Sequence, residues 1–332
     1  MKLTTVKLTH ELPEKDVAAL AGQSIGAGHY TRLIDPFTIY LKPNGQFLCL
    51  WLKDRIPLSL QRDAYRVLQH KSIAPPGSAA HRPTASGHGA DRKAGTGIIG
   101  CFDRDGRHHP YARKTAFTKN YPHLFKQFLP YCQKVNDLYK EALLEIHGNQ
   151  AFAAAFTDPA WLIEDTVFST VQVKKGFRTH VHTDGNNLHN SVAPMTCFTN
   201  AQGCELIFPK YEVAVPYGNG DLLLANVHEW HGNGPLLSDP ATSVRITCIF
   251  YLRARMPQCG PPEAELKRYR NRKVGDPVFG WLLRGMRNGV RGWFFVPEKY
   301  KGELDFEDPV SLETDEFPEE SEPVGDTDPS LV

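Results

Sequence analysis

The feature that most constrains this chain is a series of short β-type segments in its second half. Each run is rich in Val, Ile, Thr, Phe or Tyr, and Gly, Asn or Pro separates it from the next. The runs lie at 162–175, 178–182, 195–199, 204–209, 211–217, 221–226 and 243–253. Many short strands divided by turn residues are typical of a β-sandwich or barrel. We therefore expect two packed sheets of the jelly-roll kind.

The first half of the chain has helical periodicity instead. Helices are expected at 13–22, 57–70 and 122–146, and Pro130 should kink or interrupt the last of these. An Asn-Gly turn between the apolar runs 37–41 and 46–52 predicts a hairpin. Helices that precede strands indicate an α+β fold. We expect a double-stranded β-helix (jelly-roll, cupin-like) core with supporting N-terminal helices.

Composition suggests four regions. Residues 1–72 should supply helix and hairpin elements that pack on the core. Residues 73–97 form a loop rich in Gly, Pro and Ala, and residues 98–302 carry the jelly-roll domain with a basic C-terminal extension. Residues 303–332 contain twelve Asp and Glu and no Lys or Arg, so we expect an acidic disordered tail.

The net charge of +1 conceals a strong asymmetry. The whole chain has 38 Lys and Arg against 37 Asp and Glu, so residues 1–302 have 38 basic and 25 acidic residues, a net +13. A basic body indicates an anionic partner such as nucleic acid, or an ordinary basic enzyme with a solubilising tail.

The cysteine and hydropathy patterns indicate the cellular compartment in which the protein works. The seven cysteines form no CxxC pair, so neither structural zinc nor a disulfide framework is indicated. The chain has no apolar run of about 18 residues and no apolar leader. We expect an intracellular protein that is not secreted and has no membrane partner, in the nucleus of a eukaryote or otherwise in the cytoplasm.

A metal site is predicted at His182 and Asp184. Side chains two residues apart on a strand point to one face, so this pair can offer an imidazole and a carboxylate to one ion. A 2-His-1-carboxylate triad needs one further histidine and leaves open positions for substrate and O₂. The alternative is an HxH pair of a cupin-like binding protein, formed by His180 and His182.

The second histidine should come from the end of the strand that begins near residue 220. His228 and His231 both lie there. They are an odd number of residues apart, so on one strand they point to opposite faces and only one can face the metal. We predict His231, because a turn at 232–235 then ends the strand at the rim. His228 becomes a neighbour of the metal site or of the substrate.

An anchor for a small dicarboxylate is predicted on the next strand. Arg245 can grip a planar carboxylate with two parallel hydrogen bonds, and Thr247 adds a hydroxyl on the same face. This pair suits 2-oxoglutarate, with Arg178 as the alternative anchor.

Together these motifs resemble the Fe(II)/2-oxoglutarate dioxygenases, and within them the TET/JBP family that oxidises 5-methylpyrimidines in DNA. The resemblance covers about 97–255 and is carried by three segments, 97–118, 177–188 and 227–251. It implies Fe(II) held by His182, Asp184 and His231, with 2-oxoglutarate and O₂ as co-substrates; an algal relative uses ascorbate. The zinc-binding region of the animal enzymes has no counterpart here.

The resemblance also implies residues that contact a base flipped out of the duplex. Asn187 should pair with the base edge and Tyr251 should stack on the base. Arg253 stands where animal enzymes have a histidine that contacts the base. The basic run from Arg253 to Arg291, and the loop at 79–97, are candidate contacts with DNA phosphates.

The expected function is hydroxylation of 5-methylcytosine in double-stranded DNA to 5-hydroxymethylcytosine, with further oxidation as an extension, by a monomer. One alternative is hydroxylation of thymine in DNA, as in the JBP branch. Another is a small-molecule 2-oxoglutarate-dependent hydroxylase, which needs the metal and Arg motifs but neither Asn187, Tyr251 nor a basic body.

Overall fold

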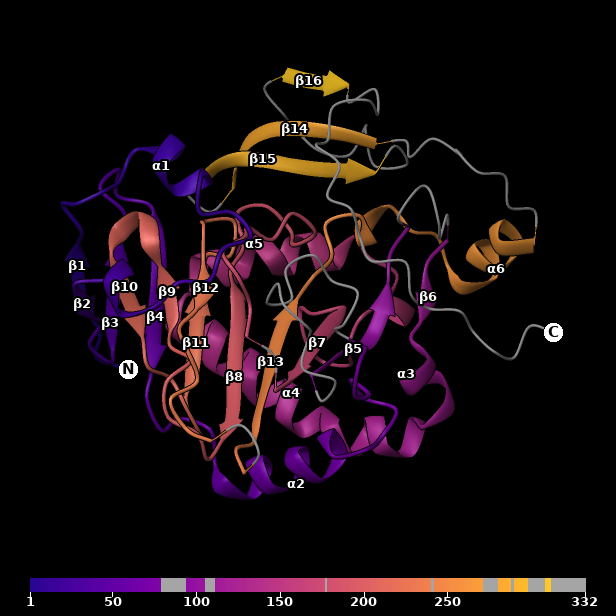
Figure 1. The fold of residues 1–332 in the computed structure, drawn as a ribbon. Helices are drawn as coiled ribbons and strands as arrows, with labels where there is room; N and C mark the ends of the chain where they lie inside the picture. The colour runs from indigo at the N-terminus through magenta and orange to yellow at the C-terminus, as the bar shows by residue number, and fades with distance from the viewer. Residues whose placement is uncertain are drawn as a thin grey trace.

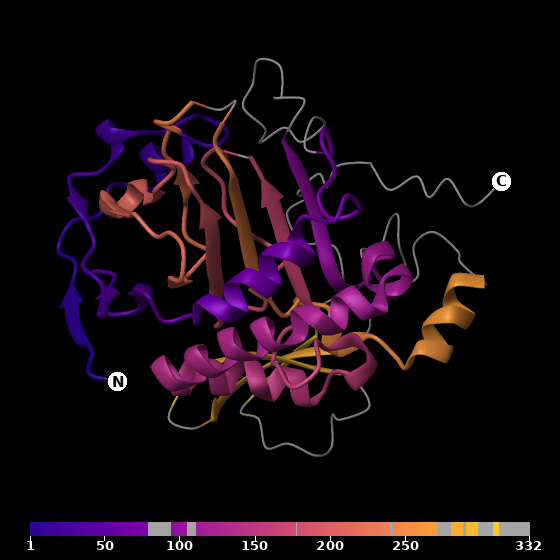
Figure 2. The same ribbon diagram turned by 90° about the horizontal axis from the view of Figure 1, so that it is seen from below.

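The computed structural model describes residues 1–78, 94–104, 111–176, 178–239 and 242–270, and the backbone of three further strands at 280–287, 290–297 and 308–311. Two β-sheets face each other, and a layer of helices covers the outer face of the larger sheet (Figures 1 and 2).

The larger sheet has nine strands in the order β1-β3-β4-β11-β8-β13-β7-β5-β6. Its central strands pair antiparallel, with β13 between β8 and β7. The strands are β1 Thr4–Lys7, β3 Thr38–Leu41, β4 Phe47–Leu52, β5 Gly95–Phe102, β6 Arg113–Lys114, β7 Thr170–Lys175, β8 Ala193–Thr199, β11 Leu222–Ala225 and β13 Arg245–Tyr251.

The smaller sheet has the order β12-β9-β10-β2. Its strands are β2 Arg32–Leu33, β9 Leu206–Phe208, β10 Val213–Val215 and β12 Gly232–Asn233. An isolated antiparallel bridge between His182 and His231 adds the metal-motif segment beside β12. Two mainly antiparallel sheets of this kind form the expected jelly roll.

Helices α2, α4 and α5 form the covering layer (Figure 2). The α-helices are α1 Glu14–Ala18, α2 Leu58–Leu68, α3 Ala116–Asn120, α4 Pro122–Ala142, α5 Leu144–Ala155 and α6 Pro262–Arg270. Short 3₁₀ turns lie at η1 Ala27–His29, η2 Pro159–Trp161, η3 Pro209–Tyr211 and η4 Met256–Gln258. None of the helices in the described ranges is long and apolar enough to cross a membrane.

The side chains of strand β13 pack into two different hydrophobic cores. Ile246, Cys248 and Phe250 pack against the helical layer, whereas Ile249 and Tyr251 pack in the core between the sheets. Because side chains alternate along a strand, Arg245 and Thr247 share the inner face with Ile249. The alternation therefore delivers two polar side chains to the space between the sheets.

Most predicted elements are confirmed. The 37–41 and 46–52 runs form the β3–β4 hairpin, in which Gly45 has a φ of 86°. Strands β7 to β11 and β13 follow the predicted β-type runs. The helix predicted at 13–22 is shorter than expected and spans Glu14–Ala18.

Two predictions are corrected. Helix α4 runs through Pro130, and the break comes at Leu143, whose φ of −135° and ψ of 61° are not helical. Helix α5 then continues past His147 to Ala155. The strand predicted at 178–182 is not formed: Thr179 and His182 make only single bridges, with loop residues around them.

The C-terminal part is described only in its backbone. Strands β14 Gly280–Arg287, β15 Val290–Pro297 and β16 Asp308–Ser311 form a third sheet in the order β15-β14-β16. Four residues of the tail expected to be disordered are therefore a strand. The rest of 303–332, the loop residues 79–93, and Arg272 and Lys273 of the basic run lie outside the described residues.

Candidate active site

His182 and His231 form the centre of the site. Their backbones exchange two hydrogen bonds, from the N–H of each to the carbonyl of the other, both 2.9 Å long. Directly opposed residues of an antiparallel pair project to the same face. The two imidazole rings accordingly lie with their centroids 4.3 Å apart.

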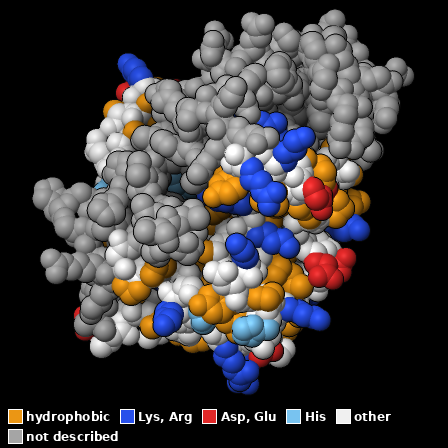
Figure 3. Space-filling view, turned by 90° about the vertical axis from the view of Figure 1, so that its right-hand side faces the viewer, with side chains coloured by type: hydrophobic (Ala, Val, Ile, Leu, Met, Phe, Trp, Pro, Cys, Tyr) orange, Lys and Arg blue, Asp and Glu red, His pale blue; other side chains and the backbone are white. Residues whose placement is uncertain are grey.

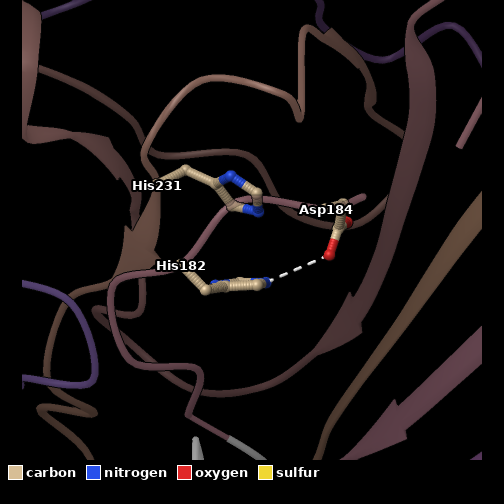
Figure 4. A group of neighbouring side chains, drawn as sticks. All are labelled: His182, Asp184 and His231. Atoms are coloured by element: carbon tan, nitrogen blue, oxygen red, sulfur yellow. Dashed lines mark ion pairs between the residues drawn. The ribbon is translucent and has the colours of Figure 1, made fainter. Parts of the chain in front are cut away.

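Asp184 completes the triad (Figure 4). Its Oδ1 lies 3.3 Å from His182 Nε2, and its backbone N–H donates to the Val227 carbonyl at 2.9 Å. One ligand atom from each of the three side chains lies within 4.8 Å of the others. Sequence alone predicted all three residues, and the structure brings them together.

Both histidines present the same ring nitrogen to the cavity. His182 Nδ1 donates to the His180 carbonyl and His231 Nδ1 donates to the Glu229 carbonyl, each at 2.9 Å. A carbonyl can only accept, so the proton is on Nδ1 and Nε2 keeps a lone pair. This tautomer is the one that a metal ion needs.

The electrostatics also suit a cation. Burial, together with the nearby His182, lowers the pKa of His231 to about 3, so its imidazole is neutral at pH 7. Burial opposes ionisation of Asp184, but the neighbouring His182, His231 and Lys174 hold the pKa of its carboxyl well below the usual range. Two imidazoles and one carboxylate are the 2-His-1-carboxylate donor set.

Arg245 and Thr247 lie in the same cavity as the triad. Arg245 is 8% exposed, and its guanidinium donates to Thr247 Oγ1 at 2.8 Å and to the Cys204 carbonyl at 3.2 Å. In the part of the chain that the structure describes, no carboxylate pairs with this buried cation. A buried charge is costly without a counter-charge, so the site is built to receive an anion.

Other cavity residues were missed by sequence reasoning. The lining also includes Lys174, Thr179, Met195, Leu206, Tyr217, Asn233 and Ile249. Lys174 Nζ donates to Thr179 Oγ1 at 3.2 Å, and burial raises the pKa of Tyr217 to about 12. Strand alternation could have identified Ile249, two residues after Thr247. Lys174 and Tyr217 carry no local signal, because only the pairing of sheets brings them here.

Two residues predicted near the cofactors lie outside the cavity. Arg178 donates to the carbonyls of Asn233 and Ile25 and does not line the cavity, so it is not the alternative anchor. His228 stacks on His189 at 4.9 Å, with its Nε2 3.3 Å from the Leu188 carbonyl. His180 donates to the Gly22 carbonyl and is no part of the triad, so the HxH alternative is wrong.

The predicted base contacts lie in a neighbouring buried group. A backbone bridge joins Asn187 to Arg253, and both residues are 4% exposed. Arg253 Nε forms an ion pair with Asp103 Oδ1 at 2.5 Å, which the sequence did not reveal. None of Asn187, Tyr251 and Arg253 lines the cavity itself. The Asp103 carboxylate holds Arg253 through its Nε, and the base contact expected for Arg253 stays a prediction.

The reason given for choosing His231 also needs correction. Strand β11 ends at Ala225, and a turn over 226–230 separates it from β12, which starts at Gly232. The alternation of side chains along a single strand therefore does not determine which of His228 and His231 faces the metal site. His231 faces the metal site because it enters the smaller sheet opposite His182.

The family comparison agrees with this geometry. Residues 99–254 match the model of the Tet_JBP oxygenase domain of the 2OGFeDO superfamily. Thymine dioxygenase JBP1 of Crithidia fasciculata is 32% identical over 165 residues, which are 48% of this chain and 20% of the relative. The bifunctional helicase and thymine dioxygenase JBP2 of Leishmania major is 24% identical over 284 residues, 82% of this chain and 25% of the relative.

The chain thus spans about a fifth to a quarter of the length of these curated relatives. Among solved structures, NgTET1 in complex with 5mC DNA has a similar fold, with a TM-score of 0.50 and 12% identity over 78% of this chain and all of that one. The matched domain contains the whole His-Asp-His triad and Arg245. Residues 99–254 of this chain are therefore similar to the oxygenase domain of the TET/JBP family within the 2-oxoglutarate- and Fe(II)-dependent dioxygenase superfamily.

Proposed function

We propose that this chain is an Fe(II)- and 2-oxoglutarate-dependent dioxygenase that hydroxylates the 5-methyl group of a pyrimidine in DNA. One observation carries the proposal. The buried Arg245 guanidinium, without a carboxylate partner among the described residues, lines the same cavity as the His182-Asp184-His231 triad. Enzymes of this class require such a metal-binding triad and, beside it, an anion-binding site with an uncompensated positive charge, which we call the anion site.

The triad fits Fe(II). Two Nε2 lone pairs and one carboxylate occupy one side of an ion and leave positions for co-substrates. When bound, Fe(II) supplies the oxidative chemistry in which 2-oxoglutarate becomes succinate and CO₂ while one oxygen atom of O₂ enters the substrate methyl group. The protein's part is to hold the donors in place and to keep both histidines in the Nδ1–H tautomer.

The anion site formed by Arg245 and Thr247 fits 2-oxoglutarate. Arg245 and Thr247 offer a guanidinium and a hydroxyl on one face of β13. The Tyr217 hydroxyl lines the same cavity and, with its pKa raised to about 12 by burial, stays protonated and able to donate. Apolar side chains of Met195, Leu206 and Ile249 fill the remaining wall. The residues therefore suit a short dicarboxylate with a carbon chain between its charged ends.

A DNA partner is supported by a basic face of the molecule. Lys and Arg side chains gather on the side of the molecule that holds β6, α3 and α6 (Figure 3). The last turn of α6 contributes Lys267, Arg268 and Arg270. The buried Glu265 ties this helix to Arg104 and to the N–H of Ala112. Clustered cations attract DNA phosphates, and a methyl group in a duplex is reachable only after the base flips out.

The identity of the base rests on Asn187. Its amide can both donate and accept, which suits the amino group of 5-methylcytosine, the base we propose first. Thymine is the second candidate, and one observation favours it. The curated relatives are thymine dioxygenases by name. The buried Asn187 Nδ2, a donor, has no acceptor among the described residues, and both bases offer it one: O4 of thymine, or N3 of 5-methylcytosine.

The proposal is tested by turnover on defined duplexes. The full chain is incubated with Fe(II), 2-oxoglutarate and duplexes that contain 5-methylcytosine or only thymine as the 5-methylpyrimidine, and the nucleosides are analysed by mass. We expect a hydroxymethyl nucleoside with wild type and none with Asp184→Ala. The duplex that yields the product identifies the base. Absence of oxidised nucleoside from both duplexes would contradict the DNA activity.

Succinate release separates this function from a small-molecule hydroxylase. A DNA dioxygenase should release succinate faster when its duplex substrate is added. If free acids stimulate succinate release and duplexes do not, the small-molecule alternative is correct.

A further inference from the structure

We propose that Lys42 and Tyr211 are positioning residues for the metal ligand His231, acting through Glu229, so that metal retention depends on an N-terminal segment outside the matched domain. The inference rests on the metal site of the proposed function and does not depend on the DNA substrate. Lys42 lies in the segment before residue 99, which the family match does not cover, whereas Tyr211 lies inside the matched domain.

The Glu229 carboxylate is held at both oxygens. Lys42 Nζ donates to Oε1 at 2.7 Å, and the Tyr211 hydroxyl donates to Oε2 at 2.8 Å. The side chains of Lys42 and Glu229 are only 9% and 15% exposed. Removal of one partner from a buried ion pair leaves the other charge uncompensated and is strongly unfavourable. Glu229 therefore has little freedom to turn away from this arrangement.

The main chain of the same residue orients the metal ligand. The Glu229 carbonyl accepts the hydrogen bond from His231 Nδ1 at 2.9 Å. A rotation of the Glu229 peptide would break this bond and release the ring from the orientation that directs Nε2 toward Asp184 and His182. Partners of the second ring nitrogen commonly fix the tautomer and direction of metal-binding histidines. The Lys42–Glu229–Tyr211 group thus acts on the metal site through one backbone carbonyl.

Neighbouring contacts hold the rest of the turn. The Asn226 N–H donates to the Leu48 carbonyl of β4 at 2.8 Å, which fixes the start of the 226–230 turn to the β3–β4 hairpin. At its other end, Trp230 Nε1 donates to Glu14 of α1 at 2.6 Å. Residues 14, 42 and 48 all precede the matched domain. The turn that carries His231 is therefore fastened to the N-terminal segment along its length.

The same segment supports the second histidine. The Gly22 N–H donates to the Val181 carbonyl at 2.8 Å, and the Val181 N–H donates to the Gln23 carbonyl at 3.1 Å. These bonds hold the residue just before His182. Gly232, which follows His231, comes so close that an added Cβ would lie 3.1 Å from Val181 N and 3.1 Å from Ile25 Cδ1. Both histidine segments are thus packed against residues 22–25.

The decisive measurement is the affinity for Mn(II) alone, a redox-stable probe of the triad, in the full chain without 2-oxoglutarate or DNA. Lys42→Met should weaken Mn(II) binding about tenfold or more, in the range seen when outer partners of ligands are lost. The matched control is Lys53→Met, an exposed lysine one residue after β4 that lies over the Trp51 ring, and its Mn(II) affinity should equal that of wild type. Lys42→Arg, which keeps the charge, should restore most of the affinity.

Thermal melting of each variant separates positioning from loss of fold. If Lys42→Met is folded at the assay temperature and binds Mn(II) as wild type does, the inference is overturned. If Lys42→Met does not fold, Tyr211→Phe carries the test, because it removes one hydroxyl from Glu229; an unchanged Mn(II) affinity in that variant overturns the inference equally. Failure of the wild type to oxidise DNA while these affinities shift as expected would defeat the DNA proposal alone.

Discussion

Each metal-binding histidine keeps one ring nitrogen for a backbone carbonyl and directs the other into the cavity. His228 also has a ring nitrogen near a backbone carbonyl, that of Leu188, but it does not line the cavity. It stacks on His189 and lies outside the triad. Substitution of His228 and of His231 should therefore have different effects on metal binding, although the two residues lie only three positions apart.

We expect His231→Ala to weaken Mn(II) binding by more than the roughly 10- to 100-fold that loss of an outer partner causes, because a direct ligand is removed. His228→Ala should bind Mn(II) as wild type does. Calorimetric titration of both variants gives the two affinities. Loss of metal in His228→Ala together with retention in His231→Ala would show that the triad is wrong.

The planar guanidinium of Arg245 cannot be replaced by another cationic side chain without loss of a hydrogen bond to 2-oxoglutarate. Arg245→Lys keeps the positive charge and loses the planar fork, so one charged hydrogen bond to 2-oxoglutarate disappears. At about 1.5–3 kcal/mol for such a bond, the affinity for 2-oxoglutarate should fall about 10- to 100-fold. Equilibrium binding of 2-oxoglutarate to the Mn(II)-loaded protein measures this. Mn(II) affinity is the internal control and should not change; an unaltered 2-oxoglutarate affinity would move the anchor elsewhere.

The Asp103–Arg253 pair should matter for stability. Asp103→Asn leaves the buried Arg253 guanidinium without its counter-charge, and we expect the free energy of unfolding to fall by about 3–5 kcal/mol. The control is Asp63→Asn, whose partner Arg66 is 77% exposed, and its effect should stay below about 1 kcal/mol. Urea unfolding of both variants provides the comparison. Equal effects would mean that the Asp103 pair is no stronger than a surface pair.

At the scale of elements, helix α6 is attached to the domain through one buried carboxylate. Glu265 accepts hydrogen bonds from Arg104 and from the N–H groups of Ala112 and Gly260. Ring contacts between Tyr111 and Tyr269, 4.6 Å apart, lie beside this attachment. The basic last turn of α6 is thus presented by a helix that depends on the ionised form of Glu265.

This attachment should give stability a pH dependence. Burial opposes ionisation of Glu265, but the bonds from Arg104 and the backbone lower its pKa. A carboxyl with a lowered folded-state pKa contributes stability above its ordinary pKa of about 4.3, and the contribution is lost as the pH falls through the folded-state value. Wild type should therefore lose more stability than Glu265→Gln on acidification from pH 5 to 3. Parallel unfolding curves of the two proteins over this range would contradict the assignment.

At the scale of the whole molecule, charge is distributed unevenly along the chain. Residues 312–332 contain eight acidic and no basic residues, so a chain that ends at 311 keeps β16 and changes its net charge from +1 to +9. We propose that these acidic residues compete with DNA for the basic face.

Truncation after residue 311 should tighten non-specific duplex binding at low salt, and the difference from the full chain should shrink as salt rises. Binding titrations at two salt concentrations test this. Turnover on a short saturating duplex should hardly change, because the triad and Arg245 are retained. Equal affinities of the two proteins at low salt would leave the tail as a passive solubilising segment.

The local sequence determined much of this protein. The Asn-Gly turn specified the β3–β4 hairpin, the apolar spacing specified α2 and α4, and the alternation in β13 put Arg245 and Thr247 on one face. His182 and Asp184 were predicted from strand alternation, but in the structure only His182 forms a bridge, so their closeness in the chain rather than a regular strand brings Asp184 to the site.

Only the tertiary structure decided the remaining features. His231 meets His182 because the 226–230 turn carries the chain into the other sheet, not because of parity within a strand. Asp103 neutralises Arg253 from 150 positions away, and Lys42 reaches Glu229 across 187 positions. The physical reason is that such contacts arise from the pairing of sheets and the burial of charge, which bring together residues with no relation along the chain.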